Sequence, residues 1–444
     1  MSFIVLGLAA FLIVMSPQML IAINLLLVVL RPQEFLLPAG TGGIVMLMLS
    51  AAAVAWIIGK KKDLSYPQLT LLTGFFLALP LSSIFSGNGG EASTALSEFF
   101  PAWLLFLVIS SSIETLEQLR RFVYLLVFLT FLIAVHSIEQ YYSDTAWAGA
   151  EILIENGVRR VRYLGIFHDP NDLGILFVCS LPLAYYGARE FRQSVVSFLF
   201  LAAALVIVYA LYLTKSRGGM LSLGFVLMLA LWRHFDFLKA AIVTGVLAVV
   251  GAGLQLRKES IGGGDQSSLD RIDGWGLGME LFQSNPLFGI GYNHYMDYYY
   301  LTAHNSLVLA LSETGLVGYI FWVSFFIVLM SLLLKVSLKP EGLKLKESEP
   351  WDSLEPAQQI NWIFFLSLAG YLFGSFFLSQ TYTIFLFLLS AFATAAWLIA
   401  YRQYNPGEDD ASAAWSIVPI SMAAAAGSIV VLWLLIHILI KISY

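Results

Sequence analysis

Nine basic residues lie in segments that we expect on one side of a membrane, because lysine- and arginine-rich loops alternate with these segments along the chain. They are Arg31, Arg159, Arg160, Arg162, Lys215, Arg217, Arg257, Lys258 and Arg271. The planar guanidinium group matches the oxygens of a phosphate with two hydrogen bonds. The excess of arginine over lysine therefore predicts a bound anion, for which a lipid-linked phosphate is the obvious candidate. Pairing with lipid headgroups or local acids is the alternative, and we prefer it for Arg257 and Lys258.

Arg217 lies in the short segment Thr214-Lys-Ser-Arg217-Gly-Gly between two hydrophobic stretches. So short a hairpin cannot reach far from the bilayer, where a charge is costly unless something fixed pairs with it. We therefore expect Arg217 to face an anionic group.

A second polar group runs from Arg162 to the start of the next hydrophobic stretch, as Arg162…His168-Asp169-Pro-Asn171-Asp172. Asp169 is a favourable helix N-cap, and the proline after it suits the first helical turn. Asp172 resembles the second member of a capping box. His168 and Asn171 are secondary site candidates, whereas Arg162 has no capping role and is a candidate ligand for phosphate.

The third group contains the candidate base. The polar segment 255–303 includes an expected amphipathic helix with Arg271, and His304 and Asn305 follow at the start of a hydrophobic helix. The dipole at a helix N-terminus favours an anion and lowers the pKa of a histidine. A neutral histidine is a suitable general base, so His304 is the catalytic candidate and His294 the reserve, and Asn305 is a further secondary candidate.

The remaining motifs predict structure. Glu313 falls nine residues after His304, on the opposite face of a straight helix, so a structural role is expected. Tyr298 to Tyr300 fit an interfacial aromatic belt better than a sugar platform. The glycines of Gly289-Ile-Gly291 are no dinucleotide fingerprint, because no βαβ unit surrounds them. The outer acidic residues form no metal-binding spacing, so we predict no metal and no cofactor.

The elements that must position these residues are membrane-spanning helices. Hydrophobic residues make up 59% of the 444-residue chain, charged residues 12%, and mean hydropathy is +0.80. A soluble domain carries about 25% charged residues. Stretches long enough to span a bilayer fall near 41–59, 66–85, 94–112, 120–140, 171–188, 195–215, 217–233, 236–254, 315–336, 361–380, 383–401 and 416–440. Residues 2–30, broken at Ser16-Pro17, add one or two more, so we expect an all-α bundle of about twelve to fourteen spans.

Orientation follows from basic loops that alternate along the chain. They contain Lys60-Lys61-Lys62, Arg120-Arg121, Arg189 with Arg192, Arg233 with Lys239, residues 335–346 and Arg402. The positive-inside rule makes that side cytoplasmic. The opposite side then holds residues 86–93, 141–170, the 215–218 turn and the long 255–303 segment.

These patterns divide the chain into four regions. Residues 1–154 hold N-terminal transmembrane helices, and residues 155–336 form a core that includes the outer loop 255–303. Residues 337–360 form a cytoplasmic loop, and residues 361–444 hold C-terminal transmembrane helices. Cys179 is the only cysteine, which excludes an intrachain disulfide.

Taken together, the three polar groups resemble the O-antigen ligase superfamily of bacterial membrane glycosyltransferases, which includes lipopolysaccharide O-antigen ligases, O-antigen and exopolysaccharide polymerases, and protein O-oligosaccharyltransferases. The matching motifs span about residues 155–320. They are Arg162…Gly165…Asp169-Pro-Asn171, Ser216-Arg217-Gly-Gly, Arg271 with Trp275, Pro286-Leu-Phe-Gly289-Ile-Gly291 and His304-Asn305…Glu313-x-Gly315-x-x-Gly318. The hydrophobic segment 416–440 departs from the twelve-span layout typical of the ligases.

The resemblance implies a GT-C-like helical fold in the bacterial cytoplasmic (inner) membrane, with the active site facing the periplasm. It implies a donor glycan carried on undecaprenyl diphosphate, and a lipid A core, a growing glycan or a protein hydroxyl as the acceptor. Membrane lipids are further expected partners, and nucleic acid is not.

The residues independently fit a metal-free transfer. A glycan on a lipid diphosphate has a good leaving group, so catalysis needs cations on the diphosphate more than a strong acid. Arg162, Arg217 and Arg271 can supply them, while His304 takes the proton of the attacking hydroxyl, and direct attack inverts the donor's configuration. We favour a ligase over a polymerase of the same superfamily. A transporter or lipid-linked glycan flippase is the alternative from another class, but it would need ionisable groups deep in the spans and repeat symmetry.

Overall fold

A computed structural model provides the fold of the chain. It describes residues 16–36, 43–59, 64–155, 157–233, 264–338, 354–405 and 412–443, with the single positions 239, 242 and 245. The predicted span 236–254, the cations Arg257 and Lys258 and most of the predicted cytoplasmic loop 337–360 lie outside the described residues.

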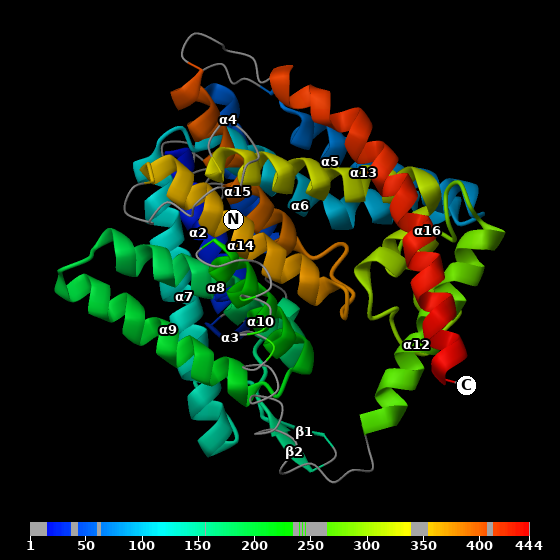
Figure 1. The fold of residues 1–444 in the computed structure, drawn as a ribbon, viewed down its shortest axis with the longest axis horizontal. Coiled ribbons are helices and arrows are strands. Elements are labelled where there is room, and N and C mark those ends of the chain that lie inside the picture. The colour runs from blue at the N-terminus through cyan, green and yellow to red at the C-terminus, as the bar shows by residue number, and fades with distance from the viewer. Residues whose placement is uncertain are drawn as a thin grey trace, which may run out of the picture.

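The described chain is an all-α, multi-span membrane protein, as the sequence predicted (Figure 1). Its helices are α2 (Pro17–Val29), α3 (Pro32–Leu36), α4 (Gly43–Ile58), α5 (Pro67–Phe85), α6 (Ala92–Ser112), α7 (Leu116–Ser143), α8 (Pro170–Glu190), α9 (Val195–Leu213), α10 (Arg217–Trp232), α12 (Gly264–Ser284), α13 (Ser306–Ser337), α14 (Pro356–Ser375), α15 (Ile384–Tyr404) and α16 (Val418–Ser443). Short 3-10 turns lie at η1 (Gly89–Glu91), η2 (Gly165–Phe167), η3 (Tyr295–Asp297) and η5 (Ser412–Ile417). Seven helical segments among the described residues are long and apolar enough to cross a membrane.

Local sequence signals explain where several helices begin. A proline occupies the first turn of α2, α5, α8 and α14, where its missing N–H costs no hydrogen bond. Asp169 caps α8 as predicted, because its carboxylate accepts a hydrogen bond from the Asn171 N–H. The predicted capping box is not formed there, since Asp172 accepts a hydrogen bond from the Gln380 side chain at 2.6 Å instead.

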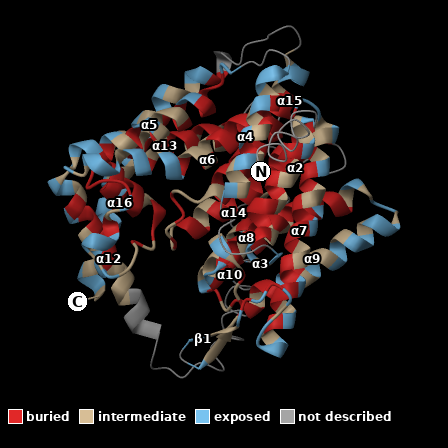
Figure 2. Ribbon diagram, turned by 180° about the vertical axis from the view of Figure 1, so that it is seen from behind, coloured by how far each residue is buried: buried red, intermediate tan, exposed pale blue. Residues whose placement is uncertain are grey.

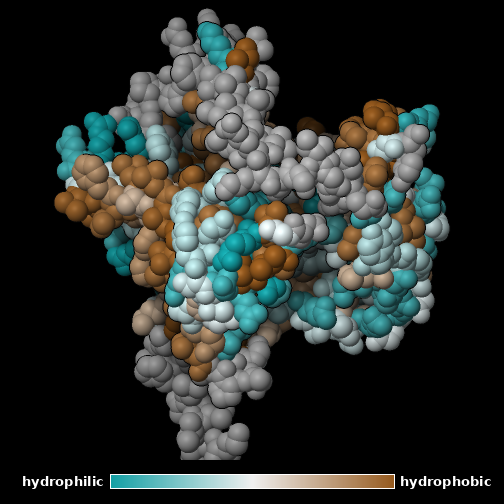
Figure 3. Space-filling view, turned by 90° about the horizontal axis from the view of Figure 1, so that it is seen from below, coloured by the Kyte–Doolittle hydropathy of each residue, from teal (hydrophilic) through white to brown (hydrophobic). Residues whose placement is uncertain are grey.

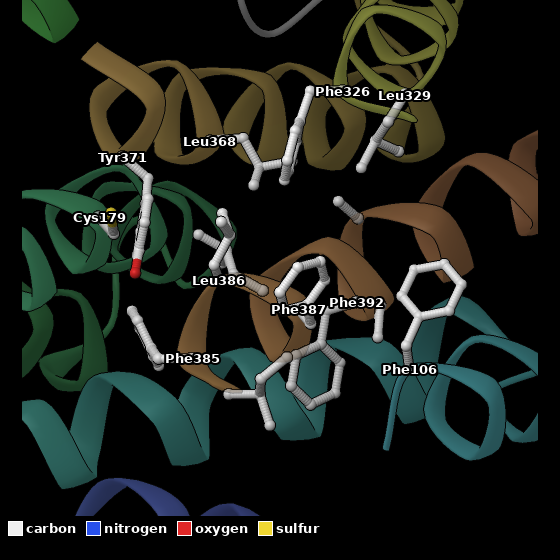
Figure 4. Close-up of a cluster of buried hydrophobic side chains, with 14 of the residues drawn as sticks. Phe106, Cys179, Phe326, Leu329, Leu368, Tyr371, Phe385, Leu386, Phe387 and Phe392 are labelled. Atoms are coloured by element: carbon white, nitrogen blue, oxygen red, sulfur yellow. The ribbon is translucent and has the colours of Figure 1, made fainter. Parts of the chain in front are cut away.

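The core lies where α13, α14 and α15 meet α5, α6 and α8. Figure 4 shows Phe385, Leu386 and Phe387 of α15 within this cluster. Burial is densest in the middle of the bundle (Figure 2), whereas α9 and α16 remain largely exposed. Apolar exposure on peripheral helices is what contact with lipid requires, so α9 and α16 are suited to the rim of the bundle.

A small β-hairpin interrupts the helices between α7 and α8. Strands β1 (Leu153–Glu155) and β2 (Val158–Arg160) are antiparallel, with Leu153 opposite Arg160. The sequence analysis did not predict it, although Asn156-Gly157 is a strong hairpin-turn signal. The hairpin fixes the position of Arg160 ahead of the helix cap.

The predicted sidedness can be tested by cysteine labelling. The only native cysteine, Cys179, is buried, so background labelling should be low. We expect Met296→Cys, at a position 58% exposed, to react with an impermeant thiol reagent added outside spheroplasts. Leu345→Cys, outside the described residues, should react only after the membrane is permeabilised. Equal labelling of both positions would contradict the topology and the mechanism that depends on it.

Candidate active site

The candidate site forms where the N-termini of α8, α10 and α13 meet the first half of α12. Figure 3 views the molecule from the end that carries β1, β2 and the beginning of α12, and hydrophilic side chains gather at the centre of this face. Helix N-termini present unpaired N–H groups and a positive dipole end. Three such ends on one side of the bundle favour an anionic ligand there.

Arg160 connects the hairpin to two of these helix ends. Its guanidinium donates hydrogen bonds to the Asn171 side-chain oxygen at 3.1 Å and to the Thr214 carbonyl at 3.2 Å. It also pairs with Glu155 at 2.6 Å. Arg160 therefore holds the start of α8 beside the turn before α10. The sequence analysis counted Arg160 among the outer cations but did not select it as a site residue.

Arg217 and Arg271 approach each other across this junction. Arg217 is the first residue of α10, after the N-cap Ser216, and its side chain is exposed. Burial lowers the pKa of Arg271, the nearby charge of Arg217 lowers it further, and Asp169 partly offsets this. Within the described part of the chain, neither Arg217 nor Arg271 forms an ion pair. Two neighbouring arginines that form no ion pair repel each other, so a bound anion would relieve that repulsion.

His304 lies next to the same cations. Burial lowers the pKa of His304, and the charge of Arg271 lowers it further. The backbone of His304 is left-handed, with φ of +47°, and its N–H donates to the Ser379 hydroxyl at 2.9 Å. Asn305, not His304, caps α13, because its side-chain oxygen accepts hydrogen bonds from the Leu307 and Val308 N–H groups. The His304 imidazole is therefore not needed as a cap.

The loop between α14 and α15 links the N-termini of α8 and α13. The Ser306 hydroxyl donates to the Leu378 carbonyl and accepts from the Gln380 N–H, each at 2.7 Å. The Gln380 side chain in turn donates to Asp172. Ser306 lies two residues after His304, and Asp172 lies in the first turn of α8. The network therefore brings the candidate base close to the start of α8.

The other predicted site residues lie in two further places. Arg162 donates to the Glu151 carbonyl at 2.8 Å and to the His168 ring at 3.0 Å, so these two candidates contact each other. His294 lies between acids instead, with Asp297 at 2.6 Å and Glu91 at 3.2 Å from its two ring nitrogens. Arg162 and His168 thus form a pair on the same loop as the α8 cap, whereas His294 belongs to an acidic group near η1.

Two other outer cations have structural partners. Arg159 pairs with Asp144 at 2.6 Å, and the Lys215 ammonium lies 3.5 Å from the centre of the Tyr212 ring. The described residues contain no group of three His, Cys, Asp or Glu side chains placed to hold a metal ion. The expectation of a metal-free reaction stays a prediction.

Close backbone contacts hold α12 in place. A Cβ at Gly278 would collide with Val308 of α13, and one at Gly276 would lie 3.0 Å from Ile440 of α16. Trp275 is buried and packs edge-on against Phe376 of α14 at 5.5 Å. Arg271 precedes Trp275 by four residues and so lies on the same face of α12. Arg271 therefore lies on the face of α12 that Trp275 packs against the bundle.

The glycines of the Pro286–Gly291 segment allow its backbone to pack closely against a kink in α13. Gly315 interrupts the helix with φ of +59°, and Gly289 and Gly291 also have positive φ. The Ile290 N–H donates to the Ser312 carbonyl at 2.9 Å, and a Cβ at Gly289 would overlap the backbone at Glu313. The buried Glu313 carboxylate accepts hydrogen bonds from the Tyr295 N–H and the Tyr382 hydroxyl. These contacts fix the Glu313 side chain, and its structural role stays a prediction.

The comparison with protein families agrees with this geometry. A family model described as O-antigen ligase matches residues 175–323, which contain Arg217, Arg271 and His304. No curated protein matches the chain at a significant level. Residues 175–323 thus carry an O-antigen ligase domain, which confirms the superfamily resemblance seen in the sequence. The described chain is a multi-pass membrane protein.

Proposed function

We propose that this protein transfers a glycan from undecaprenyl diphosphate to an acceptor hydroxyl on the periplasmic side of the bacterial inner membrane, as an O-antigen ligase does. The observation that carries the proposal is the convergence of Arg217 and Arg271, which form no ion pair among the described residues, beside His304. A GT-C-like arrangement of the helices is part of the same proposal.

The diphosphate of the donor binds to Arg217 and Arg271, and Arg160 holds the helix ends around it. Bidentate contacts from arginine stabilise the charge that develops on the leaving diphosphate. Arg162, with His168 beside it, lies on the adjacent loop and extends the polar surface toward the glycan.

His304 acts as the general base. The acceptor oxygen forms a bond to the anomeric carbon while the bond from that carbon to the diphosphate oxygen breaks. The electron pair leaves with undecaprenyl diphosphate, and the acceptor proton goes to the His304 imidazole. Burial and the charge of Arg271 keep the imidazole neutral near pH 7, which is the form a base requires. Attack opposite the leaving group inverts the anomeric configuration.

The proposal is tested with purified protein in liposomes. The donor is an undecaprenyl-diphosphate-linked oligosaccharide, and the acceptors are a lipid A core glycolipid and a second carrier-linked glycan. We expect glycosylated lipid A core, an equal amount of released undecaprenyl diphosphate and an inverted linkage by NMR. Elongation of the carrier-linked glycan would instead establish a polymerase. If neither product forms although the donor binds, glycan transfer is overturned as the function.

A further inference from the structure

Three consecutive tyrosines, Tyr298 to Tyr300, lie on a loop that is fixed at both ends. At one end the Tyr295 N–H donates to Glu313 at 3.0 Å, and the Tyr295 hydroxyl donates to the Gly274 carbonyl. At the other end the His304 N–H donates to Ser379. The loop therefore holds its tyrosines within a few residues of the candidate base.

Tyr298 and Tyr300 are exposed, whereas Tyr299 is half-buried and its hydroxyl is held by the protein. The rings of Tyr299 and Tyr300 lie 4.7 Å apart at 48°. Tyr299 donates to the Asp270 carbonyl at 2.9 Å, and the Asp270 carboxylate is near the Tyr300 hydroxyl. The Tyr300 side chain is nevertheless 64% exposed and that of Tyr298 56%. Because the Tyr299 hydroxyl is fixed and its ring packs beside that of Tyr300, the pair offers a rigid apolar surface at a low entropic cost of binding.

The surrounding charge is negative. Asp270 contacts the pair, and Asp273 is close enough to act on both tyrosines electrostatically. A tyrosine of an interfacial belt places its ring at the headgroups and its hydroxyl in water. Here the Tyr299 hydroxyl donates to the protein backbone, and the Asp270 and Asp273 carboxylates repel anionic headgroups. The cluster therefore does not fit the aromatic belt that its sequence predicted.

Aromatic rings beside carboxylates are suited to a sugar. The C–H face of a pyranose packs on an aromatic ring, and its hydroxyls donate hydrogen bonds to carboxylates. The same carboxylates disfavour phosphate or acidic substituents and favour an amino group. Asp270 is followed directly by Arg271, so one turn of α12 presents a carboxylate to this cluster and a cation to the diphosphate site.

We propose that Tyr299 and Tyr300, with Asp270 and Asp273, form the acceptor subsite and bind a neutral or amino-sugar unit of the acceptor glycan. This inference rests on the proposed transfer function. It places the acceptor beside Asp270 and leaves Arg271, the next residue of α12, for the donor diphosphate.

The test is the kinetics of Tyr299→Ala/Tyr300→Ala in the liposome transfer assay. We expect the KM for the acceptor to rise about tenfold, as the loss of aromatic stacking implies, with kcat and the affinity for donor little changed. Tyr300→Phe keeps the ring and should stay near the wild type. The matched control is Tyr142→Ala, because Tyr142 is also an exposed tyrosine hydrogen-bonded to another, Tyr209. An unchanged acceptor KM in the double variant, or an equal rise in Tyr142→Ala, would overturn the subsite.

Direct binding separates this inference from the proposed function. Saturation-transfer NMR with a soluble neutral core oligosaccharide, and with its phosphorylated counterpart, requires no catalysis. We expect the wild type to bind the neutral sugar preferentially and the double variant to lose that signal. Neutral-sugar binding without any transfer would support the subsite while contradicting the transfer function. Equal binding of both sugars by wild type and variant would overturn the subsite.

Discussion

Replacement of His304 by asparagine is expected to lower glycan transfer about 10²–10⁴-fold while donor binding and folding are retained. Asparagine is the informative substitution because position 304 has φ of +47°, which asparagine tolerates better than alanine. A loss in His304→Asn therefore reports on the imidazole and not on the backbone. The measurement is single-turnover transfer with saturating donor, alongside donor binding.

The pH dependence of the same reaction gives a second readout. Because burial and Arg271 lower the pKa of His304, the neutral base persists below the usual histidine pKa of about 6.5. The transfer rate should therefore fall with decreasing pH only below about 6.5, and the His304→Asn variant should not show this fall.

Asn305→Asp keeps a capping side chain on α13 and serves as a control for helix integrity. Normal transfer by His304→Asn would remove the base assignment, and His294 would be tested next.

Arg217→Lys is expected to impair transfer nearly as much as Arg217→Ala, by about 10–100-fold. Lysine keeps the charge but loses the planar fork that binds two phosphate oxygens together. Ser216 caps α10 through its own side chain, so neither substitution removes the helix cap. The loss should appear in donor affinity and in the rate with donor saturating, because the diphosphate gains charge as it leaves.

Lys215→Ala is the matched control for Arg217. Lys215 lies two residues away, but its ammonium packs on the Tyr212 ring, so its removal should change transfer little. Comparable losses in Lys215→Ala and Arg217→Ala, with full activity in Arg217→Lys, would mean that only the general positive charge of this turn matters.

The sequence by itself determined the class of fold and the local form of the site. Apolar stretches of spanning length became helices, because a backbone in lipid must satisfy its hydrogen bonds within the helix. The cap at Asp169 followed from its own side chain and its neighbours, and the motifs identified a superfamily that the match at residues 175–323 confirmed. Such features depend on residues a few positions apart, and sequence patterns report them directly.

Only the tertiary structure decided which polar residues meet. The contact between Asp172 and Gln380 joins residues 208 positions apart, and it replaced the predicted capping box. Arg160 rather than Arg162 reached Asn171, because the register of a hairpin that went unpredicted placed it there. His294 and His304 belong to the same outer segment, yet the kink at Gly315 and the loop anchored on Glu313 leave one between acids and the other beside Arg271. The packing of distant helices sets these contacts, and no local periodicity encodes them.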